Sequence, residues 1–305
     1  MKELTVSISP HIRSSWTTQT IMRDVLIALC PALIASCIIF GMRALLVTAV
    51  CVAACVLIEW LYEKLMKKPV TIQDLSAAVT GMILAFNLPV TIPLWQAVFG
   101  CLVAIIMVKQ LFGGIGKNFA NPAVVGRIVL FVAFSGSMTN WVYPDAVSSA
   151  TPLAILASGD LDKLPSLGYM LVGWHGGCIG ETCAIALILG GIYLIARKVI
   201  TWHIPVAFVA TVFLLTAILG ENPVYQVLSG GLLLGAIFMA TDYVTSPSTP
   251  RGKLLFGFGC GLITVLIRVW GSYPEGVSFA ILLMNILNPY ISAWTYNKPL
   301  GGAKV

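Results

Sequence analysis

The sequence predicts an all-α membrane protein with about ten transmembrane helices in two inverted five-helix repeats. Three observations lead to this prediction: a very apolar composition, an uneven distribution of basic residues along the chain and an internal repeat. The 305 residues are 58% hydrophobic and only 10% charged, whereas an average soluble domain is about 25% charged. So few polar groups cannot cover the surface of a water-soluble globule. The composition therefore excludes a soluble enzyme or binding module and favours a polytopic membrane protein.

Ten apolar segments approach the roughly 20 residues that a helix needs to cross a bilayer. Residues 1–23 are polar and contain no cleavable signal peptide, so the N-terminus is expected to stay in the cytoplasm. The interval 139–179 is too short for a separate soluble domain. The predicted spans are 24–41, 44–62, 75–92, 94–112, 122–138, 180–197, 203–220, 227–241, 253–269 and 277–295.

Basic residues predict the orientation of these spans. With ten spans and a cytoplasmic N-terminus, 15 of the 18 Lys and Arg residues fall on the inner side and only Arg43, Lys163 and Arg268 on the outer side. This asymmetry is the positive-inside pattern of membrane proteins. The net charge of +6 is thus explained by topology and requires no nucleic-acid partner. Both termini are expected in the cytoplasm, with the 139–179 loop outside.

The two halves of the chain resemble each other at an offset of about 153 to 160 residues. A Leu-Ser pair opens a short glycine-containing span in each half, at Leu75–Ser76 and at Leu228–Ser229. A Phe-Gly-Cys run follows, at Phe99–Cys101 and at Phe258–Cys260. After this run come a basic residue, Lys109 or Arg268, and a Phe-Ala pair, Phe119–Ala120 or Phe279–Ala280. An odd number of spans per repeat inverts the second copy. The expected parts are a cytoplasmic segment 1–23, repeats 24–138 and 180–296, an external loop 139–179 and a cytoplasmic tail 297–305.

Short, glycine-interrupted spans at matching positions of inverted repeats point to a ligand or ion site near the membrane midplane. The alternative is that the small residues only let the helices pack closely. The pattern by itself leaves both interpretations open.

The external loop contains the run Ser148-Ser149-Ala150-Thr151-Pro152-Leu153. Physical considerations alone favour an ordinary Ser/Thr/Pro turn. The proline after Thr151 predicts an extended backbone at that residue, which would present its hydroxyl to a modifying enzyme.

This run resembles the flavin attachment motif Ser-x-Ala-Thr-Pro-Leu of the family that includes the D subunit of Rnf complexes and the B subunit of the sodium-pumping NADH:quinone reductase. Further stretches resemble the same family in order along the chain: Gly113–Asn118, Ala120–Ala123, Trp202–Pro205, Leu228–Asp242 and Tyr273–Val277. The chain departs from the family at Ser149, where glycine is common, and at Tyr243, where proline is frequent. The absence of a long N-terminal extension favours the Rnf branch.

The resemblance implies that Thr151 carries FMN through a phosphoester, installed by a flavin transferase outside the cytoplasmic membrane, with Ser148, Ser149 and Ala150 completing the motif. It also implies a second, non-covalent flavin, riboflavin. Gly113 to Asn121 is neither a GxGxxG nor a P-loop motif and is expected to form irregular backbone lining a cavity. Asn118 and Asn121 could contact the riboflavin there; the alternative is a helix–loop packing element.

Acidic residues in or beside membrane spans are costly and often functional. Asp242 is the leading candidate for an ion pathway, with Asp24 and Asp74 behind it; an interfacial cap or an ion pair with Arg251 or Lys253 is the alternative for Asp242. Glu59 is expected to reach the surface near Lys64.

The eight cysteines form no metal-binding pattern and are expected to be packing residues. A Cys178–Cys183 disulfide and a metal shared by Cys101 and Cys260 are the weaker alternatives.

The resemblance therefore implies a membrane subunit of an ion-translocating ferredoxin:NAD⁺ oxidoreductase complex that relays electrons through FMN and contributes to Na⁺ or H⁺ transport. The chain contains no iron–sulfur, ferredoxin or NAD motif, so the isolated chain is not expected to be catalytic. The implied partners are a second flavinylated subunit, a pair of membrane subunits, and peripheral iron–sulfur and NADH-site subunits. The alternative is a urea-transporter-like channel or transporter without a redox role.

Overall fold

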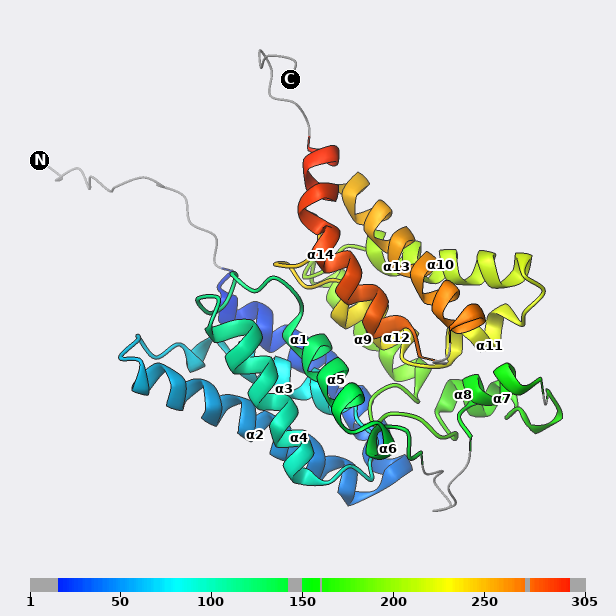
Figure 1. The fold of residues 1–305 in the computed structure, drawn as a ribbon, viewed down its shortest axis with the longest axis horizontal. Helices are drawn as coiled ribbons and strands as arrows, with labels where there is room; N and C mark the ends of the chain where they lie inside the picture. The colour runs from blue at the N-terminus through cyan, green and yellow to red at the C-terminus, as the bar shows by residue number, and fades with distance from the viewer. Residues whose placement is uncertain (1–15, 142–149, 160, 272–274, 297–305) are drawn as a thin grey trace, which may run out of the picture.

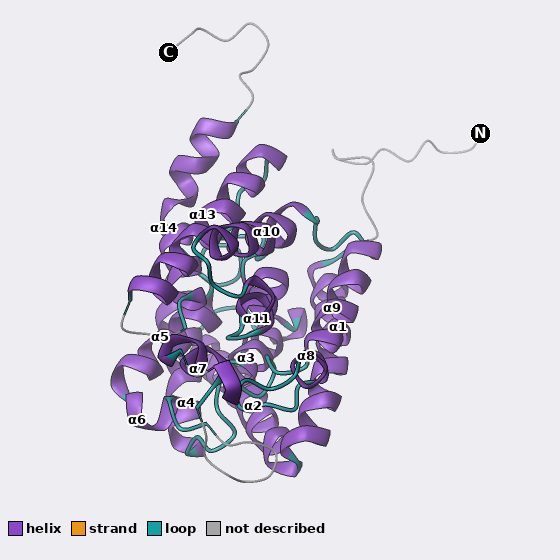
Figure 2. Cartoon of the chain, turned by 90° about the vertical axis from the view of Figure 1, so that its right-hand side faces the viewer, coloured by secondary structure: helices purple, strands orange, loops and turns teal. Residues whose placement is uncertain are grey.

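The computed structural model describes residues 16–141, 150–159, 161–271 and 275–296, and within them every regular element is a helix (Figures 1 and 2). This confirms the predicted all-α fold. Four helices are long and apolar enough to cross a membrane, namely α1 (Thr18–Phe40), α2 (Met42–Leu65), α13 (Pro250–Trp270) and α14 (Val277–Thr295). The other predicted spans are shorter or interrupted helical segments.

The first five predicted spans correspond in order to α1, α2, α3 (Ser76–Phe86), α4 (Leu94–Leu102) with the π-helix η2 (Val103–Gln110), and α5 (Pro122–Ala133). A short 3₁₀ turn, η1 (Ile72–Asp74), precedes α3. The predicted bounds are too generous. The span predicted at 75–92 ends at Phe86, and the one at 122–138 breaks at Phe134 before α6 (Ser135–Met138).

The second five spans follow the same order. They are α9 (Ala184–Ala196), α10 (His203–Ile218), a broken segment of α11 (Pro223–Leu228), α12 (Leu232–Leu234) and the π-helix η4 (Gly235–Met239), then α13 and α14. Between the two sets lie α7 (Pro152–Ser158), the 3₁₀ turn η3 (Leu161–Lys163) and α8 (Leu167–Val172).

Local sequence explains where several helices begin. Thr17 and Thr20 form a capping box at the start of α1, which satisfies backbone N–H groups that have no partner inside the helix. Asn121 and Thr249 cap α5 and α13, each followed by a proline in the first helical turn. Proline is favoured there because it lacks the N–H that the first turn leaves unbonded.

The two sets of five segments make equivalent contacts, which supports the predicted repeat. In each set the second helix packs on the third segment and on the fourth, and the fourth packs on the fifth. Equivalent helices also meet across the middle of the molecule, α1 against α9 and α5 against α14. Figure 1 shows α5 and α14 side by side at this boundary.

In each repeat the Leu-Ser pair that the sequence predicts as the start of a short span lies where the backbone leaves the helical conformation before α3 or α12. Leu75 adopts a left-handed backbone with φ of 64° before α3, and Gly230 and Gly231 adopt φ of 67° and 65° before α12. The basic residue of the fourth segment reaches this break in both repeats. Lys109 Nζ donates to Ser76 Oγ at 2.6 Å, and Arg268 Nη2 donates to the Ser229 carbonyl oxygen at 3.0 Å.

Three buried basic residues modify the charge count used for topology. That count places Lys109, Arg127 and Arg268 on the inner or outer side, but their side chains are buried, at 3%, 5% and 8% exposure. They belong to the interior because buried polar partners surround them. The asymmetry of the remaining basic residues is unchanged in direction.

Candidate functional site

The described residues line a partly open cavity of about 280 Å³ where the two repeats meet. Its size is just below the range of roughly 300–1,000 Å³ that is typical of small-molecule sites. Apolar side chains form most of the wall. They come from α1, α3, α9 and η4 and include Ile21, Met22, Val25, Ile83, Leu194 and Phe238.

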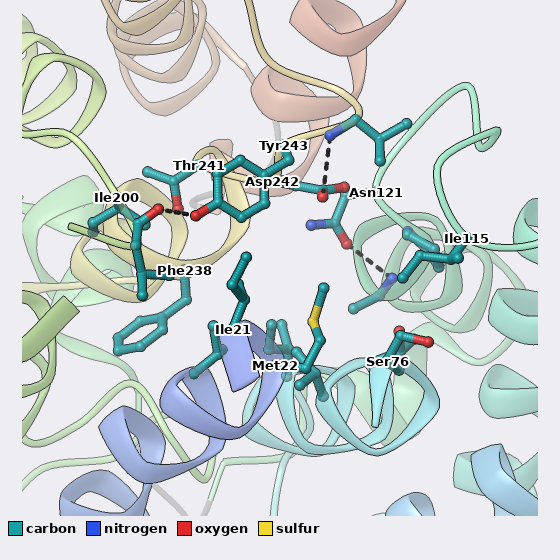
Figure 3. A pocket seen from close by; sticks show the side chains of 18 of the residues that line it. Ile21, Met22, Ser76, Ile115, Asn121, Ile200, Phe238, Thr241, Asp242 and Tyr243 are labelled. Atoms are coloured by element: carbon teal, nitrogen blue, oxygen red, sulfur yellow. Dashed lines mark hydrogen bonds between the residues drawn. The ribbon is translucent and has the colours of Figure 1, made fainter. Parts of the chain in front are cut away.

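Polar side chains gather at the other part of the wall. Figure 3 shows Asn121, Thr241 and Asp242 on one side of the open space, facing Ile21, Met22 and Ser76 on the other. Lys109 and Asn118 line the same cavity. An apolar slot with a few convergent polar groups is the usual design of a site that binds an organic ligand.

Both π-helices contribute to this cavity. Lys109 lies in η2, and Ile237 and Phe238 lie in η4. A π-helix closes each backbone hydrogen bond one residue later than an α-helix and frequently occurs at functional sites. Hydropathy patterns do not reveal such segments, because an apolar π-helix and an apolar α-helix have nearly the same composition.

Lys109 is held by a chain of buried polar groups. Its Nζ lies 2.7 Å from Oε1 and 2.9 Å from Oε2 of Glu59, which is 0% exposed. Ser76 Oγ accepts from Lys109 and donates to the Asp74 carboxylate. Asp74, one of the predicted ion-pathway residues, is thus linked to the cavity wall through Ser76.

The prediction that Glu59 reaches the surface near Lys64 is wrong. Glu59 faces the interior, where Gln110 Nε2 also donates to its Oε1 at 2.8 Å. Lys64 instead lies over the Trp60 ring, 4.8 Å from its centroid. A buried carboxylate requires a charged partner, and Lys109 from another helix supplies it.

Asn118 and Asn121 both line the cavity, as the Gly113–Asn121 segment predicted. The amide of Asn121 is already committed: Oδ1 accepts from the backbone N–H groups of Ala123 and Val124, and Nδ2 donates to the Met239 carbonyl oxygen at 3.1 Å. Asn121 therefore joins the start of α5 to the end of η4. Asn118 Nδ2 donates to the Ala120 carbonyl oxygen at 3.0 Å.

Asp242 lines the cavity just after η4. Its carboxylate accepts from the Val244 backbone N–H and from the Thr245 hydroxyl, at 3.4 and 3.2 Å. Lys253, a predicted alternative partner, donates to Thr201 Oγ1 at 3.1 Å. Among the described residues, no Lys or Arg side chain pairs with Asp242.

Asp24 forms its hydrogen bonds and its ion pair with residues of α9 and the residue after it, and not with the cavity-lining polar groups. It is 2% exposed and accepts from Tyr193 and Arg197, with Arg197 Nη2 at 3.1 Å. The Arg197 charge compensates the Asp24 charge and ties α1 to α9. Asp242 is therefore the one of the three predicted ion-pathway carboxylates that lines the cavity without a basic partner in the described chain.

Thr151 is the N-cap of α7, and its Oγ1 accepts from the Ala154 backbone N–H at 3.3 Å. Its backbone is extended, with φ of −65° and ψ of 156°, which confirms the effect predicted for the following proline. The residue is nevertheless buried, at 8% exposure, while Ala150 is exposed, so the expectation that the extended backbone presents the Thr151 hydroxyl to an enzyme is wrong for this conformation. Ser148 and Ser149 lie outside the described residues.

A second buried polar cluster forms around Arg127 and is not singled out by the sequence patterns. Arg127 Nη1 donates to Asn87 Oδ1 at 3.1 Å and to Ser278 Oγ at 2.8 Å, and Nη2 pairs with Glu275. The signal that could have found Arg127 is an ionisable residue inside an apolar segment.

Cys178, Glu181 and Glu275 also belong to this cluster, with ligand-type atoms within 4.8 Å of one another. Arg127 Nη2 lies 3.7 Å from Cys178 Sγ and pairs with Glu275. The guanidinium thus occupies the place of a cation, so these residues do not fit a metal ion.

The cysteines behave mainly as packing residues. Cys178 and Cys183 are both free, bonded to the carbonyl oxygens of Asn87 and Leu171 respectively. The alternative of a disulfide between them is therefore wrong. Cys101 contacts the Cys51 carbonyl oxygen at 3.5 Å.

Comparisons with known proteins extend over nearly the whole chain. Residues 5–301 match the family described as NQR2, RnfD, RnfE. The chain is 47% identical over 307 residues to the D subunit of the Na(+)-translocating ferredoxin:NAD(+) oxidoreductase complex of Acetobacterium woodii, covering 99% of this chain and 96% of that protein. It is 42% identical to the D subunit of the proton-translocating complex of Clostridium ljungdahlii, covering 95% and 94%. It is 33% identical to the D subunit of the ion-translocating oxidoreductase complex of Ectopseudomonas mendocina, covering 97% and 95%.

Proposed function

Because this chain belongs to the NQR2, RnfD, RnfE family, we propose that it is the D subunit of an ion-translocating ferredoxin:NAD⁺ oxidoreductase complex in the cell membrane. The observation that carries the proposal is 47% identity across 99% of the chain to a protein with that name. The relatives named above are all subunits of oxidoreductase complexes, so the alternative of a passive channel gains no support from them.

The proposed partners are the other subunits of the complex: a second flavinylated subunit, paired membrane subunits, and iron–sulfur and NADH-site subunits. The proposed orientation keeps both termini in the cytoplasm and the segment around Thr151 outside, where a flavin transferase acts. The distribution of Lys and Arg supports this orientation.

Thr151 is the proposed attachment point for FMN through a phosphoester to its hydroxyl. The extended backbone before Pro152 and the position of Thr151 at the first residue before α7 support this assignment. Bound flavin would supply the electron transfer chemistry, and the protein supplies its position and surroundings. In the described structure, burial of Pro152, Leu153 and Leu156 holds the segment against the rest of the protein.

The cavity is the proposed site for a second, non-covalent flavin, riboflavin. The lining of the cavity fits the flat, amphipathic isoalloxazine ring of a flavin. Ile21, Met22 and Phe238 form apolar walls, and Asn118 and Thr241 offer polar atoms near one part of the cavity. Asn121 would maintain the shape of the cavity, because its hydrogen bonds hold η4 against α5. Lys109 would place a positive charge at the wall.

Filling the cavity tests this second site. The change Val25→Phe places a phenyl ring in the cavity. A steric cost to flavin binding of roughly 1–3 kcal/mol from overpacking is expected to lower non-covalent flavin occupancy about tenfold. Occupancy is measured as flavin extracted by acid relative to flavin that stays on the polypeptide.

The matched control is Ile34→Phe on the same helix, where the side chain is 61% exposed and no flavin is expected to be lost. Equal extractable flavin in Val25→Phe and the parent protein would contradict the cavity assignment.

Asp242 is the proposed ion-pathway residue. Relatives are named for either Na⁺ or H⁺ translocation, and a carboxylate without a basic partner in the described chain suits either ion. The change Asp242→Asn removes the charge but keeps the shape, and we expect ferredoxin-driven ²²Na⁺ uptake or proton movement in vesicles to fall about tenfold.

The control for this experiment is Asp162→Asn in the exposed turn η3, which should leave ion movement unchanged. If Asp242→Asn transports as well as this control, Asp242 is not part of the pathway. If the parent complex shows no ferredoxin-driven ion movement with either ion, the proposed function itself is wrong.

A further inference from the structure

The external helix α7 is fitted into a notch in the second repeat. The notch lies at Gly230, and the Leu153 side chain occupies the space next to it. A Cβ atom built on Gly230 would lie 2.0 Å from Leu153 Cδ1, far inside normal contact distance. Leu153 is 4% exposed, so its side chain is enclosed by this contact.

The notch exists because the helix is broken there. Ser229 is extended and Gly230 and Gly231 are left-handed, so α11 stops and α12 starts in a new direction. Glycine adopts this conformation without steric cost, unlike residues with a Cβ. Arg268 donates to the carbonyl oxygens of Ser229 and Gly230 at 3.0 and 3.2 Å, which stiffens the break.

A second contact holds the same external segment to the same helix. The Tyr225 hydroxyl of α11 donates to the Pro165 carbonyl oxygen at 3.1 Å. Both α7 and α8 contact α11, and Figures 1 and 2 show them beside it. The external segment is thus joined to the broken segment 223–239 at two points, Gly230 and Tyr225, by residues on either side of η3.

We propose that Gly230 is a positioning residue whose notch receives Leu153 and thereby fixes Thr151 relative to the broken segment 223–239. The other end of that segment carries Ile237 and Phe238 of the cavity wall. One broken helix therefore positions both proposed flavin sites. The flavin part of this inference rests on the proposed function, whereas the docking of Leu153 rests on the contacts alone.

The test compares two glycines with similar backbones and different surroundings. Gly230→Ala introduces both a left-handed alanine and a clash with Leu153. Gly220→Ala introduces the same backbone strain, at φ of 79°, but a Cβ there meets nothing within 4 Å. The double variant Gly230→Ala with Leu153→Ala removes the end of the clashing side chain.

Two readouts are taken on the purified complex. Trypsin cleavage at Lys163, which is the one Lys or Arg within residues 139–179, reports release of the segment. Anisotropy of the covalent flavin's fluorescence reports how firmly Thr151 is held. Gly230→Ala is expected to raise the cleavage rate about tenfold and to lower the anisotropy; Gly220→Ala should match the parent protein.

The double variant is expected to cleave no faster than Gly230→Ala, because both changes disrupt the same contact between Leu153 and Gly230. The notch is overturned if Gly230→Ala cleaves no faster than Gly220→Ala, or if the double variant cleaves clearly faster than Gly230→Ala, which would mean that residues 153 and 230 act independently. If the parent chain carries no covalent flavin, the flavin proposal falls, and the cleavage rates still decide whether Leu153 docks at Gly230.

Discussion

Thr151→Ala is expected to abolish covalent flavin completely, because alanine has no hydroxyl to form the phosphoester. The readout is yellow fluorescence of the subunit band in a denaturing gel, after expression together with the flavin transferase. The change also removes the N-cap bond to the Ala154 N–H, a loss of about 1 kcal/mol. This cost is too small to unfold a protein of this size, so the lost fluorescence reports the attachment site.

This experiment has two control variants. Thr139→Ala removes an exposed hydroxyl that bonds only to the Ser135 carbonyl oxygen in the described structure, and fluorescence should be retained. Thr151→Ser keeps both a hydroxyl and a helix cap, and some fluorescence should return. Fluorescence in Thr151→Ala would disprove the attachment site, while a dark band in the parent protein would disprove the covalent flavin.

The burial of Thr151 adds a constraint on the order of events. A hydroxyl at 8% exposure is poorly accessible to an enzyme while α7 is docked. Flavin transfer should therefore be faster to the Gly230→Ala variant than to the parent protein in a time course with purified transferase, since that variant loosens the segment.

Lys109→Met is expected to be among the most destabilising single changes in the described protein. It leaves Glu59 as a fully buried carboxylate without its cation, and removing one member of a buried pair costs about 3–5 kcal/mol. Ser76 also loses its donor. Thermal unfolding of the detergent-purified complex should shift down by roughly 5 °C or more, with loss of extractable flavin because Lys109 lines the cavity.

The double variant Lys109→Met with Glu59→Gln tests the cause. Neutralising the abandoned carboxylate should recover a large part of the lost stability, since residues in contact are energetically coupled. Lys64→Met is the control, because Lys64 is exposed and lies over Trp60 at the end of α2. Equal melting temperatures for Lys109→Met and Lys64→Met would show that the Glu59–Lys109 pair contributes little.

Local patterns predicted the parts of the fold that depend on neighbours in the chain. The apolar segments placed all ten helical segments in order, and Pro152 predicted the extended backbone of Thr151. The Leu-Ser pairs at 75–76 and 228–229 predicted the starts of two short spans, and left-handed residues lie at or beside both pairs. The Gly113–Asn121 segment predicted a cavity wall, and Asn118 and Asn121 lie there.

The predicted bounds failed where a helix is interrupted inside an apolar segment. The span at 227–241 is three short pieces, and the one at 94–112 becomes a π-helix at Val103. Hydropathy averages over a window and is insensitive to the number of residues per turn. The helices α3 and α5 likewise end inside apolar sequence, at Asn87 and Phe134, and a window average does not locate such ends.

The sequence by itself determined the class of protein and the order of its helices, because these follow from hydropathy and charge. The proposal that Thr151 carries flavin rests on the resemblance of a contiguous motif. Only the tertiary structure decided which charged residues lie inside. Lys109 meets Glu59 from 50 residues away, and Arg127 meets Ser278 from 151 residues away. Burial of a charge is stable only beside its partner, and that partner comes from another helix through packing that no local pattern contains.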